Sequence, residues 1–426
     1  MELVTPAGAA PLEGVDRIRI LARQGEGDVR EAEGPVTADG FDVALPIVDL
    51  VLPVTLTVRL TGPSTELIGA PPVFIPLETG GLVRVPVGQP DTCEVIAGMV
   101  VDSPRSALGL SPQGTFALTI GGRGSSGASD AAGYLDLLRL EGDAFDPLDV
   151  PLGVAVAVPL SRALALVVSE GREPFIYDVS SATAPVLPVV LHPGAGLRSA
   201  LAALPAGGAV VAGGDVGGLA VSDVTWIGPM GDTSTTRLVV ARIGAAIATF
   251  GDAVLIAAGA DGGPLAERAT AASAAFEPVA PAFDDGVRVG AALFVDPASG
   301  TALLVGGLGA DGSIRADTVV LSGCPSACVA TAGPAWPSPR PDTVAVHLPS
   351  GGGLIVGGTG PVAVVDRVIL DAEGARFEAA GSLATPRQAP AALALEQGVT
   401  FVVGGLGPEG PRADVEVCFP PALGIP

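Results

Sequence analysis

Four cysteines are the most reactive side chains of this 426-residue sequence, and their spacing limits the chemistry they can do. Three residues separate Cys324 from Cys328, whereas Cys93 and Cys418 lie far apart in the chain. A zinc site would need a second closely spaced pair, and both histidines are remote. Redox pairs use a two-residue spacing, so the short loop indicates a disulfide-closed turn. We expect disulfides rather than free thiols, which favours an oxidising compartment.

Acidic residues are plentiful, but none is set out as a catalytic pair. Glu94, Glu267 and Glu416 are candidates for general acid–base chemistry, and nothing in their spacing singles them out. Asp261-Gly262 and Asp311-Gly312 could begin calcium loops, yet they complete no known calcium-binding pattern and indicate tight turns. The sequence contains no GxSxG, HExxH or P-loop motif. We therefore predict no catalytic residue, no metal and no other cofactor.

The charge balance excludes several classes of partner. The 45 acidic residues outnumber the 22 basic ones, all of which are Arg, and the net charge is −23. Such a field repels phosphate groups, so we expect binding neither to nucleic acid nor to anionic membranes. No apolar window reaches the length of a transmembrane helix without a charge or a breaker. The N-terminus shows no export signal, so we expect either a cytosolic chain or one whose signal or lipid anchor was removed.

Short apolar runs that end in glycine indicate the elements that would position these side chains. Helical periodicity is nearly absent, and the runs stop at Gly, Pro, Asp or Ser, which is typical of strands and turns. Five runs end in a glycine pair, namely Gly121-Gly122, Gly213-Gly214, Gly306-Gly307, Gly357-Gly358 and Gly404-Gly405. Ala258-Gly259 is a degenerate pair, and the run 163–168 fits a weakened copy. The spacing of about 47 residues predicts seven four-stranded blades of a β-propeller.

Arginine recurs in phase with the glycines. In six units an Arg lies 16 to 19 residues before the second glycine: Arg105, Arg198, Arg242, Arg288, Arg340 and Arg387. A ring of guanidinium groups could collect carboxylates or sulfates. Alternatively, each Arg pairs with an acidic residue or with carbonyls of a neighbouring blade. We favour this structural role, because catalytic sites break the symmetry of a repeat whereas these residues follow it.

The combination of an apolar strand, a glycine pair and a Pro-x-Arg-like turn resembles the kelch family over residues 92–420. The best copy runs from Pro386-Arg387 to Gly404-Gly405, and the second unit lacks both markers. Propellers of this family commonly have six or seven blades, so the resemblance implies an all-β fold with a seven-bladed kelch-like propeller. The last unit supplies strands near 388–396, 399–404 and 412–418 and lacks its fourth, outermost strand, so we expect a strand over 92–99 to complete it. Cys93 and Cys418 would then be cross-strand neighbours able to form a disulfide, worth roughly 5 kcal/mol in closing its long loop.

One kelch-type enzyme, galactose oxidase, holds copper with two tyrosines and two histidines. Tyr134, Tyr177, His192 and His347 are the corresponding residue types here, but their positions suggest no convergent geometry. The cysteine that the oxidase cross-links to tyrosine has no counterpart once all four cysteines pair. A copper site is therefore not expected.

Residues 1–90 do not carry the repeat and form a separate predicted domain, followed by the propeller over 91–426. Apolar and polar residues alternate in the segments 16–22, 41–45, 54–60 and 82–87. Several short alternating strands in this length predict a small β-sandwich with an immunoglobulin-like outline. Residues 88–90 form the predicted linker.

These observations predict a noncatalytic, exported bacterial protein. We expect it to bind a protein or glycan through its propeller loops at the cell surface, or to be a structural part of the envelope. The alternative is a carbohydrate-active enzyme, of isomerase or oxidase type, that uses the central channel. A channel with two or more unpaired carboxylates would favour the enzyme, and one filled by Ala and Val would favour binding, since the fold alone does not set function.

Overall fold

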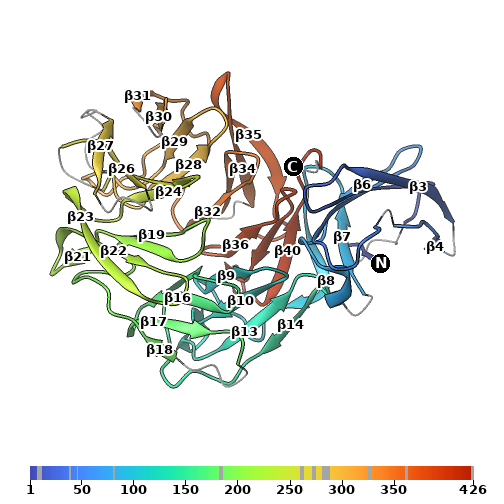
Figure 1. The fold of residues 1–426 in the computed structure, drawn as a ribbon, viewed down its shortest axis with the longest axis horizontal. Helices are drawn as coiled ribbons and strands as arrows, with labels where there is room; N and C mark the ends of the chain where they lie inside the picture. The colour runs from blue at the N-terminus through green and yellow to red at the C-terminus, as the bar shows by residue number, and fades with distance from the viewer. Residues whose placement is uncertain are drawn as a thin grey trace.

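The structure is a computed structural model that describes residues 1–6, 12–37, 40–45, 47–79, 82–181, 186–259, 263–270, 275–280, 288–324, 328–359 and 363–423. Within these residues it contains strands and one 3₁₀ turn, η1 (Pro76–Thr79), but no α-helix. Seven antiparallel sheets surround a common centre as the blades of a β-propeller, and an N-terminal sheet lies against the outside of the ring (Figure 1). The predicted all-β class and the seven-bladed propeller are confirmed.

The first four blades follow chain order from the innermost strand outward. Blade 1 contains β9 (Gly109–Gln113), β10 (Phe116–Ile120), β13 (Ala132–Asp136) and β14 (Glu141–Ala144). Blade 2 contains β15 (Ala155–Pro159), β16 (Leu164–Ser169), β17 (Arg172–Asp178) and β18 (Val186–Pro188). Blade 3 contains β19 (Ala200–Ala203), β20 (Ala209–Ala212), β22 (Leu219–Ile227) and β23 (Thr233–Arg242), with β21 (Asp215–Val216) beside β22. Blade 4 contains β24 (Ala246–Phe250), β25 (Ala253–Ala257), β26 (Ala266–Thr270) and β27 (Glu277–Ala280).

The last three blades complete the ring. Blade 5 contains β28 (Ala292–Asp296), β29 (Thr301–Val305), β30 (Val319–Ser322) and β31 (Val329–Ala332). Blade 6 contains β32 (Thr343–His347), β33 (Gly353–Gly357), β34 (Val364–Asp371) and β35 (Gly374–Ser382). Blade 7 contains β36 (Ala391–Ala394), β37 (Thr400–Val403), β40 (Asp414–Cys418) and, from before the first blade, β8 (Cys93–Val100). Two small ribbons, β11 (Arg123–Gly124) with β12 (Gly127–Ala128) and β38 (Leu406–Gly407) with β39 (Gly410–Pro411), extend the loops.

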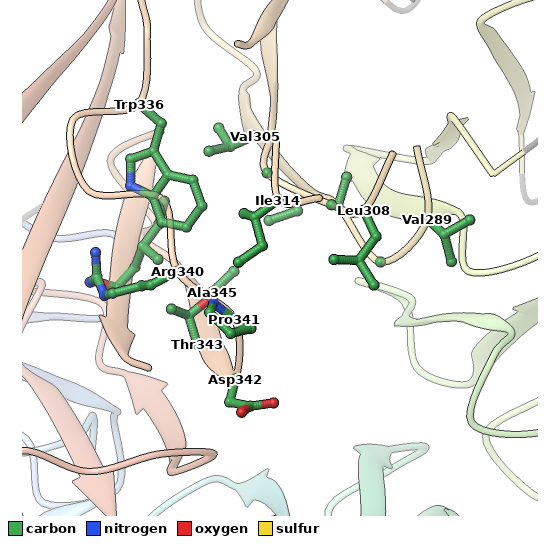
Figure 2. A pocket seen from close by; sticks show the side chains of 16 residues that line it. Val289, Val305, Leu308, Ile314, Trp336, Arg340, Pro341, Asp342, Thr343 and Ala345 are labelled. Atoms are coloured by element: carbon green, nitrogen blue, oxygen red, sulfur yellow. The ribbon is translucent and has the colours of Figure 1, made fainter. Parts of the chain in front are cut away.

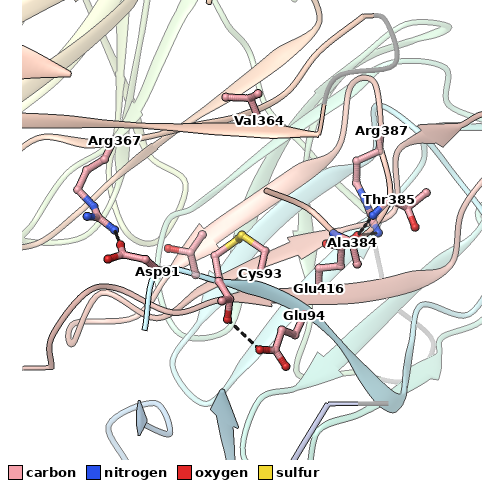
Figure 3. The surroundings of a disulfide bond; sticks show 12 residues. Asp91, Cys93, Glu94, Val364, Arg367, Ala384, Thr385, Arg387 and Glu416 are labelled. Atoms are coloured by element: carbon pink, nitrogen blue, oxygen red, sulfur yellow. Dashed lines mark hydrogen bonds and ion pairs between the residues drawn. A yellow bond between two sulfur atoms is a disulfide. The ribbon is translucent and has the colours of Figure 1, made fainter. Parts of the chain in front are cut away.

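Strand β8 closes the ring as the outermost strand of blade 7. It runs antiparallel to β40 and places Cys93 directly opposite Cys418, and the two cysteines form a disulfide (Figure 3). Close by, Arg367 of blade 6 donates to the carboxylate of Asp91 at 2.6 Å. Cys324 and Cys328 form the second disulfide. Both expected bridges, and the closing strand, are confirmed.

Small apolar side chains allow the blades to pack face to face. The second strand of blade 4, β25, is buried at all five positions, as is β29 of blade 5, because each strand lies between neighbouring blades. Leu255 and Leu304 from these two strands share one apolar cluster. The innermost strands contact their neighbours in a closed circle, β9-β15-β19-β24-β28-β32-β36. The short Ala- and Val-rich runs thus build the core of the propeller.

The N-terminal segment differs from the expected sandwich. Its strands are β1 (Glu2–Val4), β2 (Arg17–Gln24), β3 (Arg30–Thr37), β4 (Gly40–Phe41), β5 (Val54–Thr61), β6 (Glu66–Gly69) and β7 (Arg84–Gly88). They follow one hydrogen-bonded path, β1-β7-β6-β5-β2-β3-β4. A sandwich needs two facing sheets, so the immunoglobulin-like prediction is not confirmed. Alternation correctly indicated the buried face of β2, but β5 is buried on both faces over its first five residues, and alternation did not indicate which strands pair.

This sheet packs on blades 7 and 1. Ile68 of β6 belongs to the same apolar cluster as Phe401 of β37. Arg84 of β7 donates to the carbonyl of Arg139 at 2.8 Å, beside its ion pair with Glu141 of blade 1. The N-terminal sheet is therefore held to the ring beside its point of closure.

Candidate functional site

The repeated arginines and glycines are joined by a hydrogen bond that recurs from blade to blade. In five blades the Arg side chain donates to the carbonyl of the first residue of the glycine pair, at 2.5 to 3.0 Å. The pairs are Arg105 with Gly121, Arg242 with Ala258, Arg288 with Gly306, Arg340 with Gly357 and Arg387 with Gly404. Each Arg thus binds within the blade that it precedes, not a neighbouring blade.

Carboxylates neutralise these buried guanidinium groups. The partners are Asp102 for Arg105, Glu267 for Arg242, Asp317 for Arg288, Asp366 for Arg340, and Asp414 and Glu416 for Arg387. Burial raises the pKa of Glu416, while Arg387 and the backbone N–H groups of Ala384 and Thr385 oppose that rise. Two of the three acid–base candidates, Glu267 and Glu416, therefore form buried ion pairs with arginines. The third, Glu94, is half-buried on β8 and accepts a hydrogen bond from Thr92.

In blade 3 a histidine takes the place of the arginine. The side chain of Arg198 is 54% exposed and lies 3.8 Å from Asp215. Instead, Nε2 of His192 is 2.9 Å from the carbonyl oxygen of Gly213, and its Nδ1 is 2.9 Å from the hydroxyl of Thr225. Burial lowers the pKa of His192, so the neutral ring is favoured, with Nε2 as the donor. Sequence reasoning missed this substitution because the histidine lies outside the spacing that the arginines share.

Backbone hydrogen bonds join each blade to the next near the channel. The first kind, here called the glycine bond, runs from the N–H of the second glycine to the carbonyl of the Arg that begins the next blade. It is present for Gly214 with Arg242, Gly259 with Arg288, Gly358 with Arg387 and Gly405 with Arg105, at 2.8 to 3.0 Å. The approach is close: a Cβ on Gly404 would lie 2.5 Å from the carbonyl oxygen of Arg105.

A second kind, here called the turn bond, involves the residue two positions after each Arg. After five of the six arginines, all but Arg198, this residue is left-handed, with φ of 50° at Ala107, 60° at Gly244, 74° at Gly290, 56° at Asp342 and 42° at Ala389. Its N–H donates to a backbone carbonyl in the turn that begins the preceding blade. The pairs of donor and acceptor are Gly244 with Arg198, Gly290 with Gly244, Ala389 with Asp342, and Ala107 with Ala389. The four seams between blades 3 and 4, 4 and 5, 6 and 7, and 7 and 1 thus carry both bonds.

The seam between blades 5 and 6 carries neither bond. Among the described residues, Gly307 makes no hydrogen bond to the carbonyl of Arg340, and Asp342 makes none to the carbonyl of Gly290. A cavity of about 380 Å³ lies at this seam. Figure 2 shows Val289, Leu308 and Ile314 on its blade 5 side, facing Trp336 and Arg340 from the segment that leads into blade 6.

The walls of the seam cavity are apolar, and most polar groups near it already have partners. Asp366 accepts hydrogen bonds from Nε1 of Trp336 at 2.9 Å and from Arg340 at 2.6 Å. Asp342, in contrast, is exposed at the mouth, and its carboxylate receives no hydrogen bond from any residue the structure describes. The seam therefore combines an apolar hole, one available carboxylate and unpaired peptide groups. Sequence reasoning singled out Arg340 and the pair Gly306-Gly307 among the lining residues. The remaining signal was an Asp at 342, where other units have Ala or Gly.

The innermost strands give the channel an apolar lining of small residues. They consist mainly of Ala, Val and Leu, and their titratable residues, Asp296 and His347, each stand at the last position of a strand. The carboxylate of Asp296 accepts hydrogen bonds from the N–H groups of Ala298 and Ser299, as in a turn. These strands present no pair of carboxylates.

The residues considered for copper lie on different blades. Tyr134 is on blade 1 and Tyr177 is fully buried on blade 2, and each ring contacts Phe145. His347, on blade 6, is exposed and lies beside Phe294. Within the described part of the chain, no three His, Cys, Asp or Glu residues are grouped to bind a metal. Asp311 accepts hydrogen bonds from Ser313 as a turn residue does, and Asp261-Gly262 falls outside the described residues.

No protein-family model matches this sequence, and no curated protein matches it. Among the described residues, no helix has the length and hydropathy needed to cross a membrane.

Proposed function

We propose that this chain is a noncatalytic binding protein of the bacterial cell surface, built on a kelch-like propeller, and that it recognises another protein through the loops at one end of its channel. The observation that supports this most directly is the seam cavity, whose apolar walls offer contact surface and no unpaired acid–base pair. Phased Arg and glycine residues that share one hydrogen bond support the kelch-like assignment.

A protein partner fits the surface better than a glycan. Sugar sites commonly present aromatic rings as flat apolar platforms, and both tryptophans of this chain are engaged inside it: Trp336 is 4% exposed, and Trp226 stacks on Phe276. The same apolar lining counts against the carbohydrate-active enzyme, because hydrolysis or isomerisation requires positioned acid and base groups.

Export is part of this proposal, whether to the periplasm, the outer-membrane surface or the medium, with a lipid anchor as one route. The two disulfides support it, because such bonds persist in oxidising compartments. Protein isolated from its native host without reductant should carry no alkylatable thiol. Four alkylatable thiols would contradict export.

The binding function can be tested with the immobilised chain and an envelope fraction from its native host. We expect a protein that is retained saturably and released by soluble, untagged chain, while an unrelated acidic protein of similar net charge retains none of it. A glycan array and a screen for sugar turnover run in parallel. Turnover of a sugar, without any saturable protein partner, would contradict the proposal and favour the enzyme.

A further inference from the structure

We propose that the seam between blades 5 and 6 binds an extended polypeptide segment in which a large apolar side chain stands next to Lys or Arg. This inference rests on the proposed binding function and names the chemistry of the partner. Three features of the seam carry it: the size of its cavity, its free peptide groups and the carboxylate of Asp342.

The cavity is of the size that accepts side chains rather than a folded element. Its volume of about 380 Å³ lies near the lower end of ligand pockets, which run from roughly 300 to 1,000 Å³. Val289, Leu308 and Ile314 supply one wall, and Ala345 and Trp336 supply the other (Figure 2). An aliphatic or aromatic side chain would replace water at these surfaces, which is favourable in proportion to the apolar area covered.

Free backbone groups beside the cavity suit an extended main chain. At the four seams with glycine and turn bonds, these groups pair across the seam, but the N–H groups of Gly307 and Asp342 have no acceptor among the described residues. The carbonyls of Arg340 and Gly290 lack the matching donors there. Extended peptides bind by supplying main-chain partners to such groups, while alternate side chains enter pockets.

Asp342 gives the site its charge preference. Its carboxylate lies at the mouth of the cavity and points away from Arg340, which is itself bound to Asp366 (Figure 2). With a net charge of −23, the chain attracts cationic segments from a distance, and Asp342 supplies a local partner for one of them. A carboxylate-bearing or neutral segment lacks both contributions.

The backbone at Asp342 indicates that this side chain is not needed for folding. The residue has a φ of 56°, and the same turn position holds Gly244, Gly290, Ala107 and Ala389 in other blades. Left-handed backbone is easiest for glycine, and asparagine or aspartate tolerates it better than most other residues. Asp342→Ala therefore reproduces a native turn of this propeller and separates binding from stability.

The probe is a library of random eight-residue peptides displayed on phage and selected against the immobilised full-length chain. Selected peptides are synthesised with a fluorescent label and titrated by fluorescence polarisation. We expect them to share Leu, Ile, Val, Met or Phe adjacent to Lys or Arg. Asp342→Ala should weaken their binding about 2- to 5-fold, as removal of an exposed ion pair does, and should not change the binding of peptides whose basic residue is replaced by Gln.

Two leucines provide a matched pair of variants. Leu308 follows the glycine pair of blade 5 and lines the cavity. Leu406 follows the glycine pair of blade 7, and the seam between blades 7 and 1 carries both the glycine bond and the turn bond. The two leucines are similarly exposed, at 42% and 37%. Leu308→Glu should weaken peptide binding by at least about fivefold, because it removes an apolar wall and places a carboxylate against the apolar side chain of the peptide, at a desolvation cost that outweighs its attraction for the basic residue. Leu406→Glu should change it by less than about twofold, and thermal unfolding should be alike for both.

Three results would overturn the inference: selected peptides without an apolar–basic pair, equal effects of the two leucine variants, or no retained peptide. If an envelope protein binds saturably and is indifferent to Leu308→Glu and Asp342→Ala, the seam assignment is wrong while the binding function stands. If the host envelope contains no saturable partner at all, the proposed function itself fails.

Discussion

Removing the Cys93–Cys418 disulfide should destabilise the protein much more than removing the Cys324–Cys328 disulfide. The first bridge joins residues 325 positions apart and the second joins residues four apart. Because a cross-link restricts the unfolded chain in proportion to the logarithm of the loop it closes, the long loop is worth about 5–6 kcal/mol and the short one about 2 kcal/mol. All four cysteines are buried, so replacing a pair by alanines removes similar packing in each case. The expected difference in the free energy of unfolding is therefore about 3–4 kcal/mol.

The assay is equilibrium unfolding in guanidinium chloride, followed by the fluorescence of Trp226 and Trp336. The wild type is compared with Cys93→Ala/Cys418→Ala and with Cys324→Ala/Cys328→Ala, all under nonreducing conditions. The slope of the transition must be similar in the three proteins for their free energies to be compared. Equal losses in the two variants, or a larger loss for the short loop, would refute the view that this bridge stabilises the ring through chain entropy.

Four further predictions concern the residues of the repeat. Ala258→Gly should stabilise the protein by about 0.5–1 kcal/mol in thermal unfolding, because Ala258 has a φ of 60° where other blades have glycine; no gain would mean that this turn is unstrained. Gly404→Ala should do the reverse, because its Cβ would collide with the carbonyl of Arg105. Arg242→Met should cost about 3–5 kcal/mol in chemical denaturation, since it leaves the fully buried Glu267 without its cation, and the double variant with Glu267→Leu should recover much of that loss. Burial lowers the pKa of His192 below its ordinary value of 6.5, so the unfolded chain binds a proton more readily, and stability should fall as the pH drops through about 6.5; His192→Gln should flatten this dependence between about pH 7.5 and 5.5, and an unchanged profile would contradict it.

The propeller could be predicted because its markers have fixed structural roles. Arg387 and Gly404 recur at one spacing because the guanidinium of the first binds the carbonyl of the second. The lack of a fourth strand after residue 418 predicted closure by 92–99, because an unpaired outer edge of the last blade had a candidate partner and a cysteine on each side. The spacing of the repeat and the unpaired edge of the last blade together predicted the propeller, although each motif is weak alone.

Other features depend on contacts between residues whose spacing follows no repeat. His192 reaches Gly213 from a loop of different length, so the arginine spacing pointed to Arg198 instead. Alternation in residues 17–24 marked a buried face, but the single sheet arises from pairings that periodicity does not encode. The seam between blades 5 and 6 could not be predicted from the sequence either. Its residues are of ordinary type, and what distinguishes it is the absence of the glycine bond and the turn bond among the described residues.

Two of the departures from the repeat, in blade 3 and at the seam between blades 5 and 6, differ in whether the protein itself compensates for them. In blade 3 the carbonyl of Gly213 loses an arginine but gains His192 and the hydroxyl of Ser199, so the local hydrogen bonding is restored. At the seam between blades 5 and 6, no described residue replaces the missing glycine bond and turn bond, and an apolar cavity lies there. Asp342 and Gly290 are exposed at this seam, so their unpaired peptide groups are accessible to a partner from outside the chain, which could pair with them and cover the apolar cavity at the same time. The seam, rather than the channel or the arginine ring, is therefore where binding should be sought.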